Sequence, residues 1–392
     1  MHPEDLTERQ EALGAWLARW RPLWASRPFH GIPVPWEEQE PSLAAWLRVR
    51  TEEEVERFED APATHPQAPA LLRSLAAQAE ALASLPVLAA RDGPEHPPHG
   101  VPGRKWGQVM AFLDLLGPQR REAVDWCAGK GHLGRSLAAG TGATVHCVER
   151  DPSLCAAGQA LADQAGLPVR FWTEDALALP GPAAVQSGRR LVALHACGDL
   201  STRALELATD RSASGLAVAP CCFHRVKAAR YSPLAGPDLG LDRELLRLPC
   251  SEEVVASARL RRLRRREMHL RLLVDHLLRE RTGQDRYRNL PSVPDVWLRL
   301  SDADFVARIS DRDGLALDPT PAAVTQAARA AGDRLRISRA LAFVRVPFRR
   351  PLEVFLALDR ARWLVAQGWR VRLGTFCDRA LTPRNLALVA ER

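Results

Sequence analysis

The chain has 392 residues, of which 46% are apolar and 26% charged, and its net charge is +7. This length allows at least one full hydrophobic core and two or three structural units, in a composition typical of globular proteins. No apolar run reaches the length of a membrane span, and the first residues lack the pattern of a secretory signal. The eight scattered cysteines favour reduced thiols in a cytoplasmic protein over a disulfide framework.

The N-terminal part of the chain reads as helical. Trp16, Trp20 and Trp24 recur at every fourth residue, and tryptophans at this helical spacing usually form a core face. The stretch Thr51–Glu54 has the form of an N-cap with a capping box, which predicts a helix start. A further helix is expected over about residues 70–85.

After an irregular boundary at residues 91–103, the chain alternates strands and helices. The strand-like runs lie at about 123–127, 144–149, 169–173, 190–196 and 215–220. Helical segments are expected between the first four runs, and a short one between the last two. This alternation indicates a mostly parallel sheet with helices on both faces. A helix over 351–368 and strands over 369–376 and 385–390 are expected to complete a seven-stranded sheet.

The sequence therefore predicts a Rossmann-like α/β fold with two added helical parts. The expected segments are an N-terminal helical domain (1–95), an α/β core with the first five strands (96–228), an Arg-rich helical insertion after strand five (229–345), and a C-terminal helix and strand pair (346–392).

A glycine-rich loop follows the first strand. Gly129, Gly131 and Gly134 fit the pattern G-x-G-x-x-G between a strand and a helix. Such glycines allow a tight turn and a close approach of a ligand to backbone amides. The pattern alone fits NAD, S-adenosylmethionine, or a turn that holds no cofactor.

Three carboxylates favour S-adenosylmethionine over NAD. Asp125 on the first strand suits the cationic ammonium of that cofactor, whereas it would repel an anionic pyrophosphate. Glu149 ends the second strand, where it can accept hydrogens from both ribose hydroxyls, as it could in either cofactor. Asp175 follows the third strand and can accept from the adenine amino group.

The stretch Asp125-x-Cys127-x-Gly129-x-Gly131 resembles motif I of class I S-adenosylmethionine-dependent methyltransferases. That motif usually has glycine where this chain has Cys127. Because cysteine carries a Cβ, we expect Cys127 to keep a negative φ. The expected cofactor contacts are Asp125, Cys127, Ala128, Gly129, Gly131, Leu133, Glu149, Arg150, Asp175, Ala176 and His195.

Two further strand ends are expected to carry the chemistry, since ligands of an open parallel sheet bind outside the carboxyl ends of its strands. The fourth strand ends in His195-Ala196-Cys197-Gly198-Asp199 and the fifth in Pro220-Cys221-Cys222-Phe223-His224. Both endings resemble a branch of class I methyltransferases that includes the methyltransferase-like 25 group and the Trm13-like tRNA ribose methyltransferases. The resemblance implies methyl transfer and leaves the acceptor open, because the branch is chemically mixed.

Two flanking segments add to this resemblance. Gly103–Val109 is similar to the branch's Lys-Lys-x-x-Glu-Val helix, with Gln108 in place of the acid. Leu381–Asn385 is similar to its Ser/Thr-Pro-Arg hairpin.

Three polar residues at these ends are candidate catalytic groups. His195 is either a general base, since its ordinary pKa is near neutrality, or a hydrogen-bonded residue that shapes the loop. Asp199 could orient His195, contact the methionine ammonium, or cap a helix that begins at Leu200. His224 is either an acceptor contact or a loop residue.

Cys221 and Cys222 have three interpretations. With Cys197 and His224 they could bind zinc, but the usual C-x-x-C spacing is missing, and no metal is expected. A Pro-Cys strand end could also be a nucleophile that adds to a pyrimidine ring. We favour small, soft side chains that let the backbone and the acceptor approach closely.

Residues 259–288 carry eleven arginines against four acids, a local charge of +7. Such a basic helix suits phosphate contacts, which give salt-sensitive affinity for nucleic acid, and Tyr287 could stack on a base. The alternative is a solvated helix of an Arg-biased chain that packs by its leucines. The candidate nucleic-acid contacts are Arg259, Arg262, Arg265, Arg266 and Arg271.

These observations together predict a cytoplasmic S-adenosylmethionine-dependent methyltransferase that needs no metal, with RNA as the favoured acceptor. Two rival hypotheses remain. One is methylation of a protein or a small molecule, and the other is a scaffold that binds the cofactor without turnover.

Overall fold

The computed structural model describes residues 3–88, 103–117, 120–251 and 257–392. Its contacts divide the chain into two compact units. Met1–Arg19, Ala79–Glu252 and Phe348–Arg392 form the first, which we call the sheet unit; Trp20–Gln78 and Glu253–Pro347 form the second, the helical unit. The boundary expected at 91–103 lies, except for its last residue, outside the described residues, and the four-segment division stays a prediction.

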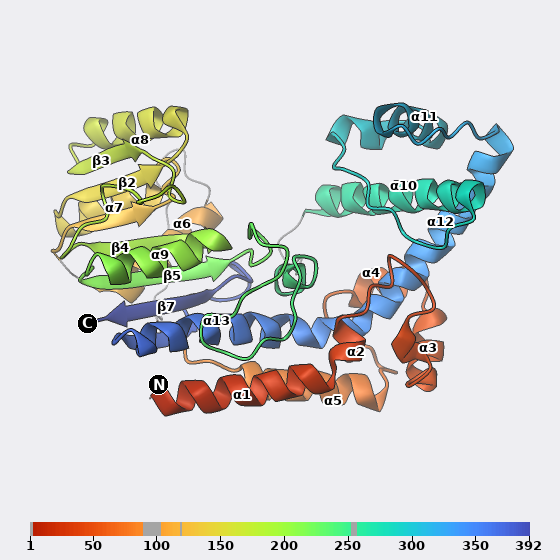
Figure 1. Cartoon of the computed structure of the whole chain (residues 1–392), viewed down its shortest axis with the longest axis horizontal. Helices are drawn as coiled ribbons and strands as arrows, with labels where there is room; N and C mark the ends of the chain where they lie inside the picture. Colours follow the sequence, from red (N-terminus) through yellow and green to blue (C-terminus); the bar gives the residue numbers. More distant parts are fainter. Residues whose placement is uncertain (1–2, 89–102, 118–119, 252–256) are drawn as a thin grey trace. The chain divides into compact units, whose positions relative to one another are not determined.

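The sheet unit is built on seven strands in the order β3-β2-β1-β4-β5-β7-β6 (Figure 1). The strands are β1 (Ala123–Trp126), β2 (Val145–Glu149), β3 (Val169–Thr173), β4 (Arg190–Cys197), β5 (Gly215–Cys221), β6 (Arg370–Thr375) and β7 (Leu386–Glu391). The first five pair in parallel, and β7 runs antiparallel to both β5 and β6. The predicted seven-stranded, mostly parallel, Rossmann-like sheet is confirmed.

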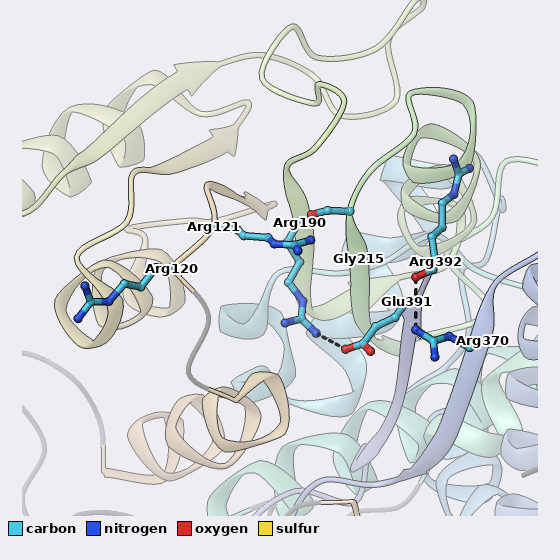
Figure 2. Close-up of a pocket in the computed structure, with 8 residues that line it drawn as sticks. Arg120, Arg121, Arg190, Gly215, Arg370, Glu391 and Arg392 are labelled. Atoms are coloured by element: carbon cyan, nitrogen blue, oxygen red, sulfur yellow. Dashed lines mark hydrogen bonds and ion pairs between the residues drawn. The ribbon is translucent and has the colours of Figure 1, made fainter.

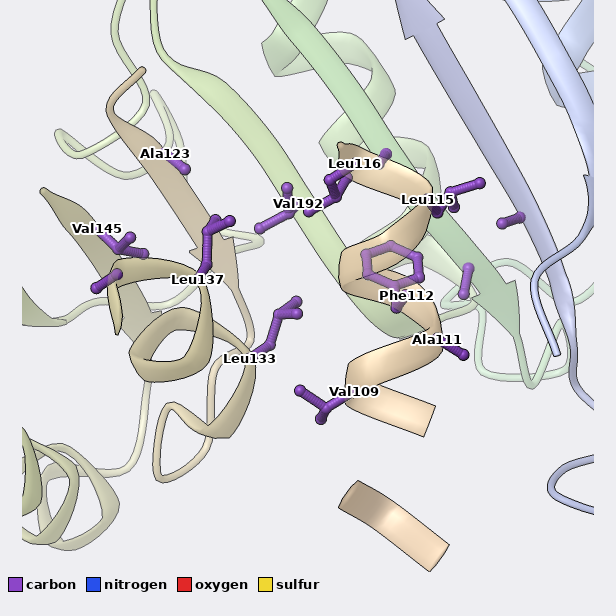
Figure 3. Packing of buried hydrophobic residues seen from close by; sticks show 14 of the residues in the cluster. Val109, Ala111, Phe112, Leu115, Leu116, Ala123, Leu133, Leu137, Val145 and Val192 are labelled. Carbon is purple, nitrogen blue, oxygen red and sulfur yellow. The ribbon is translucent and has the colours of Figure 1, made fainter. Parts of the chain in front are cut away.

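Helices cover both faces of this sheet. They are α6 (Gly103–Leu116), α7 (His132–Thr141), α8 (Pro152–Gln164), α9 (Asp199–Asp210) and α13 (Arg349–Ala366). Helix α1 (Pro3–Arg19) packs against α13. On one face, Phe112 of α6 and Leu137 of α7 pack with Val192 of β4 in one buried cluster (Figure 3). On the other face, the Trp126 indole donates to the backbone carbonyl of Leu200 in α9 at 3.0 Å.

The helical unit has its own core. Its helices are α2 (Arg21–Trp24), α3 (Pro41–Arg48), α4 (Glu52–Phe58), α10 (Ala258–Thr282), α11 (Asp302–Asp313) and α12 (Pro321–Leu341), while α5 (Ala70–Ala83) is divided between the units. Leu273, Phe305 and Leu335 are among the side chains that α10, α11 and α12 bury together. The expected capping box is present, since the Glu54 amide donates to Thr51 Oγ1 at 3.2 Å. None of the described helices is long and apolar enough to cross a membrane.

Short 3₁₀ turns connect several of these elements. They cover Pro35–Glu37, Pro62–Thr64, Leu245–Cys250, Asp295–Arg299 and Ala342–Phe348.

The expected distribution of helices between the strands is wrong at two places. The segment from residue 174 to 189, between β3 and β4, contains no helix, because Pro180, Gly181 and Pro182 interrupt it. The connection between β4 and β5 instead holds the 12-residue helix α9, which the sequence had indicated as short.

The tryptophan series does not form one helical face. Helix α1 ends at Arg19, and the short helix α2 begins at Arg21 with Pro22 in its first turn, where proline is tolerated. Trp16 stacks on Phe348 in the sheet unit, with ring centroids 4.7 Å apart. Trp24 is fully buried in the helical unit. The tryptophans of this series are therefore divided between two separate hydrophobic cores.

We expect Gly134→Ala to destabilise the sheet unit by about 1–3 kcal/mol, because overpacking at a tight contact forces neighbours to shift. A Cβ at Gly134 would lie 2.6 Å from Cys147 Sγ and 3.0 Å from Asp125 Oδ2. Gly140→Ala in the same helix is the matched control, since a Cβ there meets nothing within 4 Å. Urea denaturation measures both; equal stability of the two variants would contradict the prediction.

Candidate functional site

The loop between β1 and α7 follows the backbone path of a glycine-rich motif. Gly131 precedes α7 with a φ of +66°, and a Cβ there would lie 2.6 Å from the Phe171 ring. Cys127 also has a positive φ, +58°, so the expectation that its Cβ keeps φ negative is wrong. A left-handed backbone costs a residue with a Cβ roughly 1–2 kcal/mol. The surrounding structure therefore imposes the loop shape against the preference of cysteine.

Left-handed backbone recurs at the neighbouring strand ends. Five non-glycine residues of the described chain have positive φ, and three of them are Cys127, His195 (+63°) and Cys222 (+46°). They lie at the carboxyl ends of β1, β4 and β5. In β4 the register with β5 shifts between Ala193 and Ala196, as in a β-bulge that re-aims a side chain. Such strain is typical of functional sites.

Asp125 is turned into the protein. It is 2% exposed, and its Oδ2 accepts a hydrogen bond from the Gly134 amide at 2.8 Å. Burial raises the pKa of this carboxyl to about 7. The carboxyl thus ties β1 to the first turn of α7, a role that the sequence pattern did not indicate.

The two other predicted acids lie beside the same loop. Glu149 Oε2 accepts from the Gly129 amide at 3.0 Å, and its Oε1 accepts from the Arg150 amide at 2.9 Å. Asp175 is exposed, and its Oδ1 accepts from the Leu177 amide at 3.0 Å. Burial, followed by the charges of Glu149, Asp125 and the more distant Asp175, raises the pKa of Cys127 to about 12. The charges of all three acids therefore act on Cys127.

The remaining cofactor candidates have different surroundings. The Ala128 amide donates to the Val148 carbonyl at 3.0 Å, which ties the loop to β2. Leu133 and Ala176 are buried, at 4% and 6% exposure, so they support the loop from within. Arg150 is exposed at the end of β2.

His195 is held by a residue that the sequence analysis did not assign to the site. Its Nε2 lies 2.9 Å from Gln108 Oε1, and Gln108 Nε2 donates to the Leu381 carbonyl at 3.2 Å. An amide oxygen can only accept a hydrogen bond, so His195 Nε2 must carry the proton. The other ring nitrogen, Nδ1, is left as the proton acceptor. Burial lowers the pKa of His195 to about 4, so the ring is neutral near pH 7.

Asp199 is not a helix cap. Helix α9 begins at Asp199 itself, with Gly198 at the N-cap position. The Asp199 carboxylate accepts from the Lys227 amide at 2.7 Å, and its own amide donates to the Arg225 carbonyl at 3.1 Å. Asp199 thereby fastens the segment after β5 to the start of α9.

The cysteines at the ends of β4 and β5 lie together. The sheet register pairs Cys197 with Cys221, and their sulfurs are 3.4 Å apart. The sulfurs of Cys197, Cys221 and Cys222 all lie within 4.8 Å of one another. The thiol of Cys250 also makes a hydrogen bond with Cys222. Cys250 was missed, because 28 residues separate it from Cys222 and no spacing rule connects them.

Cations gather on the same side as the two histidines. Burial is the main cause of the lowered pKa of His195, and the charges of Arg384 and Lys105 lower it further. Burial is also the main cause that lowers the pKa of His224, and the charges of Arg247, Arg225 and Arg384 lower it further. Lys105, Arg225 and Arg247 are exposed. Lys105 also acts on Asp125 and His132, so its charge reaches the loop after β1 as well as His195.

The arginines of the helical unit are largely engaged within it. Arg266 Nη1 pairs with Asp302 at 2.7 Å, Arg271 Nη2 pairs with Glu267 at 2.7 Å, and Arg265 pairs with Glu56. Arg259 and Arg262 are exposed at the start of α10. Tyr287, expected to stack on a base, stacks on His30 with centroids 4.6 Å apart. One face of that ring is therefore covered by the protein.

A separate basic pocket of about 380 Å³ opens at the opposite edge of the sheet (Figure 2). It is lined by Arg120, Arg121, Arg190, Ser214, Gly215, Arg370, Glu391 and Arg392. Arg190 and Gly215 are the first residues of β4 and β5, so the pocket lies at the amino ends of these strands. It is distinct from the carboxyl edge that holds Gly129 and His195.

The buried Asp125 gives the sheet unit a pH-dependent stability. Its folded pKa of about 7 exceeds the ordinary value of 3.8, so the folded state keeps a proton that the unfolded chain has released between these pH values. Stability from this group is therefore lost as pH rises from about 4 to 7.

We expect Asp125→Asn to remove this loss. Above pH 7 the free energy of unfolding of the variant should exceed that of the wild type by on the order of 3 kcal/mol. Chemical denaturation across this pH range measures the effect. Asp163→Asn, an exposed change on α8, is the control. An unchanged pH profile in Asp125→Asn would contradict the assignment.

Comparison with known families places residues 104–229 in a family described as a methyltransferase domain. Several solved structures are similar to parts of the chain. A putative sarcosine dimethylglycine methyltransferase from Galdieria sulphuraria is 17% identical, with a TM-score of 0.24, over 29% of this chain and 44% of that one. TehB from Haemophilus influenzae is 12% identical, with a TM-score of 0.24, over 31% of this chain and 41% of that one.

An RNA methyltransferase from Salinibacter ruber, in complex with S-adenosyl-L-homocysteine, is 18% identical, with a TM-score of 0.25. That match covers 36% of this chain and 86% of the other. The chain spans less than half the length of the first two structures. The family match covers β1 to β5 and both sides of the carboxyl edge. Residues 104–229 therefore match the model of a methyltransferase domain.

Proposed function

We propose that the chain is an S-adenosylmethionine-dependent methyltransferase. The observation that carries the proposal is the pair of carboxylates beside the loop after β1. Glu149 Oε2 accepts from the Gly129 amide at 3.0 Å, Asp175 is exposed after β3, and a sulfonium cofactor is cationic at both its sulfur and its ammonium. Near the ends of β4 and β5, the charges of Arg384 and Lys105 act on His195, and those of Arg247, Arg225 and Arg384 act on His224.

The loop residues would hold the cofactor in three ways. Glu149, whose oxygens now accept backbone amides, would accept the ribose hydroxyls. Asp175 would accept from the adenine amino group. Asp125 would act through the loop it fastens to α7, with Gly129 and Gly131 allowing the close approach.

The residues at β4 and β5 would serve the acceptor. Methyl transfer is a one-step displacement at the sulfonium carbon, and a hydroxyl acceptor must also lose a proton. A neutral His195 can take that proton at Nδ1, because Gln108 holds Nε2 in its protonated form. His224, Cys221 and Cys222 would border the acceptor, with Asp199 holding their loop in place.

We propose RNA as the acceptor. The exposed Lys105, Arg225 and Arg247 stand beside the histidines, where they can contact backbone phosphates. The resemblance to the Trm13-like branch supports the same substrate class. A protein or small-molecule acceptor remains the alternative, and so does a scaffold that binds the cofactor without turnover.

We expect Glu149→Gln to weaken binding of S-adenosylhomocysteine by roughly 10- to 100-fold, since it removes the charge from two hydrogen bonds to the ribose. Isothermal titration calorimetry measures the affinity. Glu122→Gln, which neutralises an acid paired with Arg189 near the start of β4, is the matched control and should bind as the wild type does. Wild-type affinity in Glu149→Gln would overturn the proposed cofactor site.

Incubation with methyl-labelled cofactor and fractionated cell extract tests turnover itself. Label in RNA supports the proposed acceptor, and label in protein or small molecules contradicts it. Binding without label in any fraction would identify a scaffold.

Binding to labelled tRNA should weaken steeply with salt. We expect the double variant Arg225→Gln, Arg247→Gln to reduce the slope of log K against log salt by about 0.7–0.9 per lost phosphate contact. The double variant Arg265→Gln, Arg271→Gln removes the same charge from paired positions and should change the slope little. Fluorescence anisotropy measures both. Equal slopes in the wild type and the first variant would contradict the assigned contacts.

A further inference from the structure

The cysteines that end β4 and β5 form a cluster with an arrangement that bordering an acceptor does not by itself explain. We propose that Cys197, Cys221, Cys222 and Cys250 bind one soft metal ion, with zinc as the ion best suited to the set. The inference goes beyond the proposed function, because it concerns four side chains whose arrangement is independent of the cofactor loop.

The sheet itself brings the first three ligands together. Cys197 and Cys221 are direct neighbours in the parallel β4–β5 ladder, with sulfurs 3.4 Å apart. Cys222 follows with a left-handed backbone, φ +46°, and its sulfur lies within 4.8 Å of both others. Four sulfurs at the zinc–sulfur distance of about 2.3 Å stand roughly 3.8 Å apart in a tetrahedron, close to this spacing.

Cys250 lies outside the group of three sulfurs that are within 4.8 Å of one another, and its thiol would move toward them to become the fourth ligand. It ends the 3₁₀ turn Leu245–Cys250, and its thiol makes a hydrogen bond with Cys222. The Arg384 guanidinium bonds to the carbonyl of Cys250 and so ties this turn to the hairpin before β7. A metal at the cluster would join three segments: the ends of β4 and β5 and the turn at Leu245–Cys250.

The chemistry of the four groups favours a metal over packing alone. Thiolates are the ligands that zinc prefers in closed sites. The left-handed backbone of Cys222 and the close packing of Gly198 against the Arg225 carbonyl show that the surrounding structure holds these ends against local strain.

The usual spacing rule does not apply to this arrangement. A C-x-x-C pair places two sulfurs on one turn, and its absence led the sequence analysis to expect no metal. In this chain the pairing of Cys197 with Cys221 between β4 and β5 brings two sulfurs together without such a turn. Sulfurs 3.4 Å apart are also well beyond the disulfide bond length of about 2.05 Å, so Cys197 and Cys221 are reduced thiols.

The test uses the untagged full chain, purified anaerobically from zinc-supplemented cells. We expect elemental analysis to find about one zinc per chain for a closed four-sulfur site. Cobalt exchanged into the wild type should give the intense near-ultraviolet thiolate-to-metal bands and visible bands of a tetrahedral sulfur site. Cys222→Ser and Cys250→Ser should each lose most of the metal. Cys377→Ser, a half-buried cysteine outside the cluster, should keep it.

Three results would overturn the proposal. The first is wild-type protein that contains no metal and takes up no cobalt. The second is full metal content in both Cys222→Ser and Cys250→Ser. The third is an intact mass and a thiol count that show a Cys197–Cys221 disulfide in the anaerobic protein. The cobalt spectrum of the wild type decides the matter even where a variant does not fold, and no readout depends on methyl transfer.

Discussion

The reversal of strand order between β1 and β4 is the constraint on which the site depends. From β1 the sheet extends through β2 and β3 in one direction, and from β4 through β5 in the other. The connections after β1 and β4 therefore lead to helices on opposite faces, which leaves the carboxyl ends of these two strands open to a ligand. Glu149 and Asp175 follow strands on one side of this point, and His195 and His224 lie at strand ends on the other. A cationic cofactor and an anionic acceptor would thus meet where the order reverses.

Backbone geometry at this edge is set by the fold and not by the residue type. Cys127, His195 and Cys222 adopt left-handed conformations that a glycine would adopt at less cost. Each has a side chain that glycine lacks: a thiol beside the cofactor loop, an imidazole bonded to Gln108, and a thiol in the cysteine cluster. At all three positions the strained backbone carries a side chain with a polar or sulfur atom. Strain of this kind motivates the proposal that these side chains act at the edge.

The elements that could be predicted from the sequence are those with a periodic pattern of apolar residues. Alternating apolar runs gave all seven strands, and the carboxylates after them indicated the cofactor side. Sequence reasoning failed where distant segments decide the outcome. The 3₁₀ turn that brings Cys250 to Cys222 has no local signal, and the bond between Gln108 and His195 joins residues 87 positions apart. It also failed where one local residue overrides a period, as Pro22 does in the tryptophan series and Pro180 does before β4.

The basic segment at 259–288 shows how ion pairs reduce the charge that a helix offers to a ligand. Its excess of arginine suggested a nucleic-acid surface, yet Arg266 and Arg271 are held by carboxylates of their own unit, and Arg279 and Arg334 both pair with the buried Asp275. Arginines in such pairs must give up a bonded partner before they bind a phosphate, so they offer less affinity than their number implies. The cations near His195 and His224 are fewer, but three of the four are exposed beside the proposed chemistry. Position and pairing, rather than the number of arginines, are therefore the reason for proposing the RNA contacts in the sheet unit.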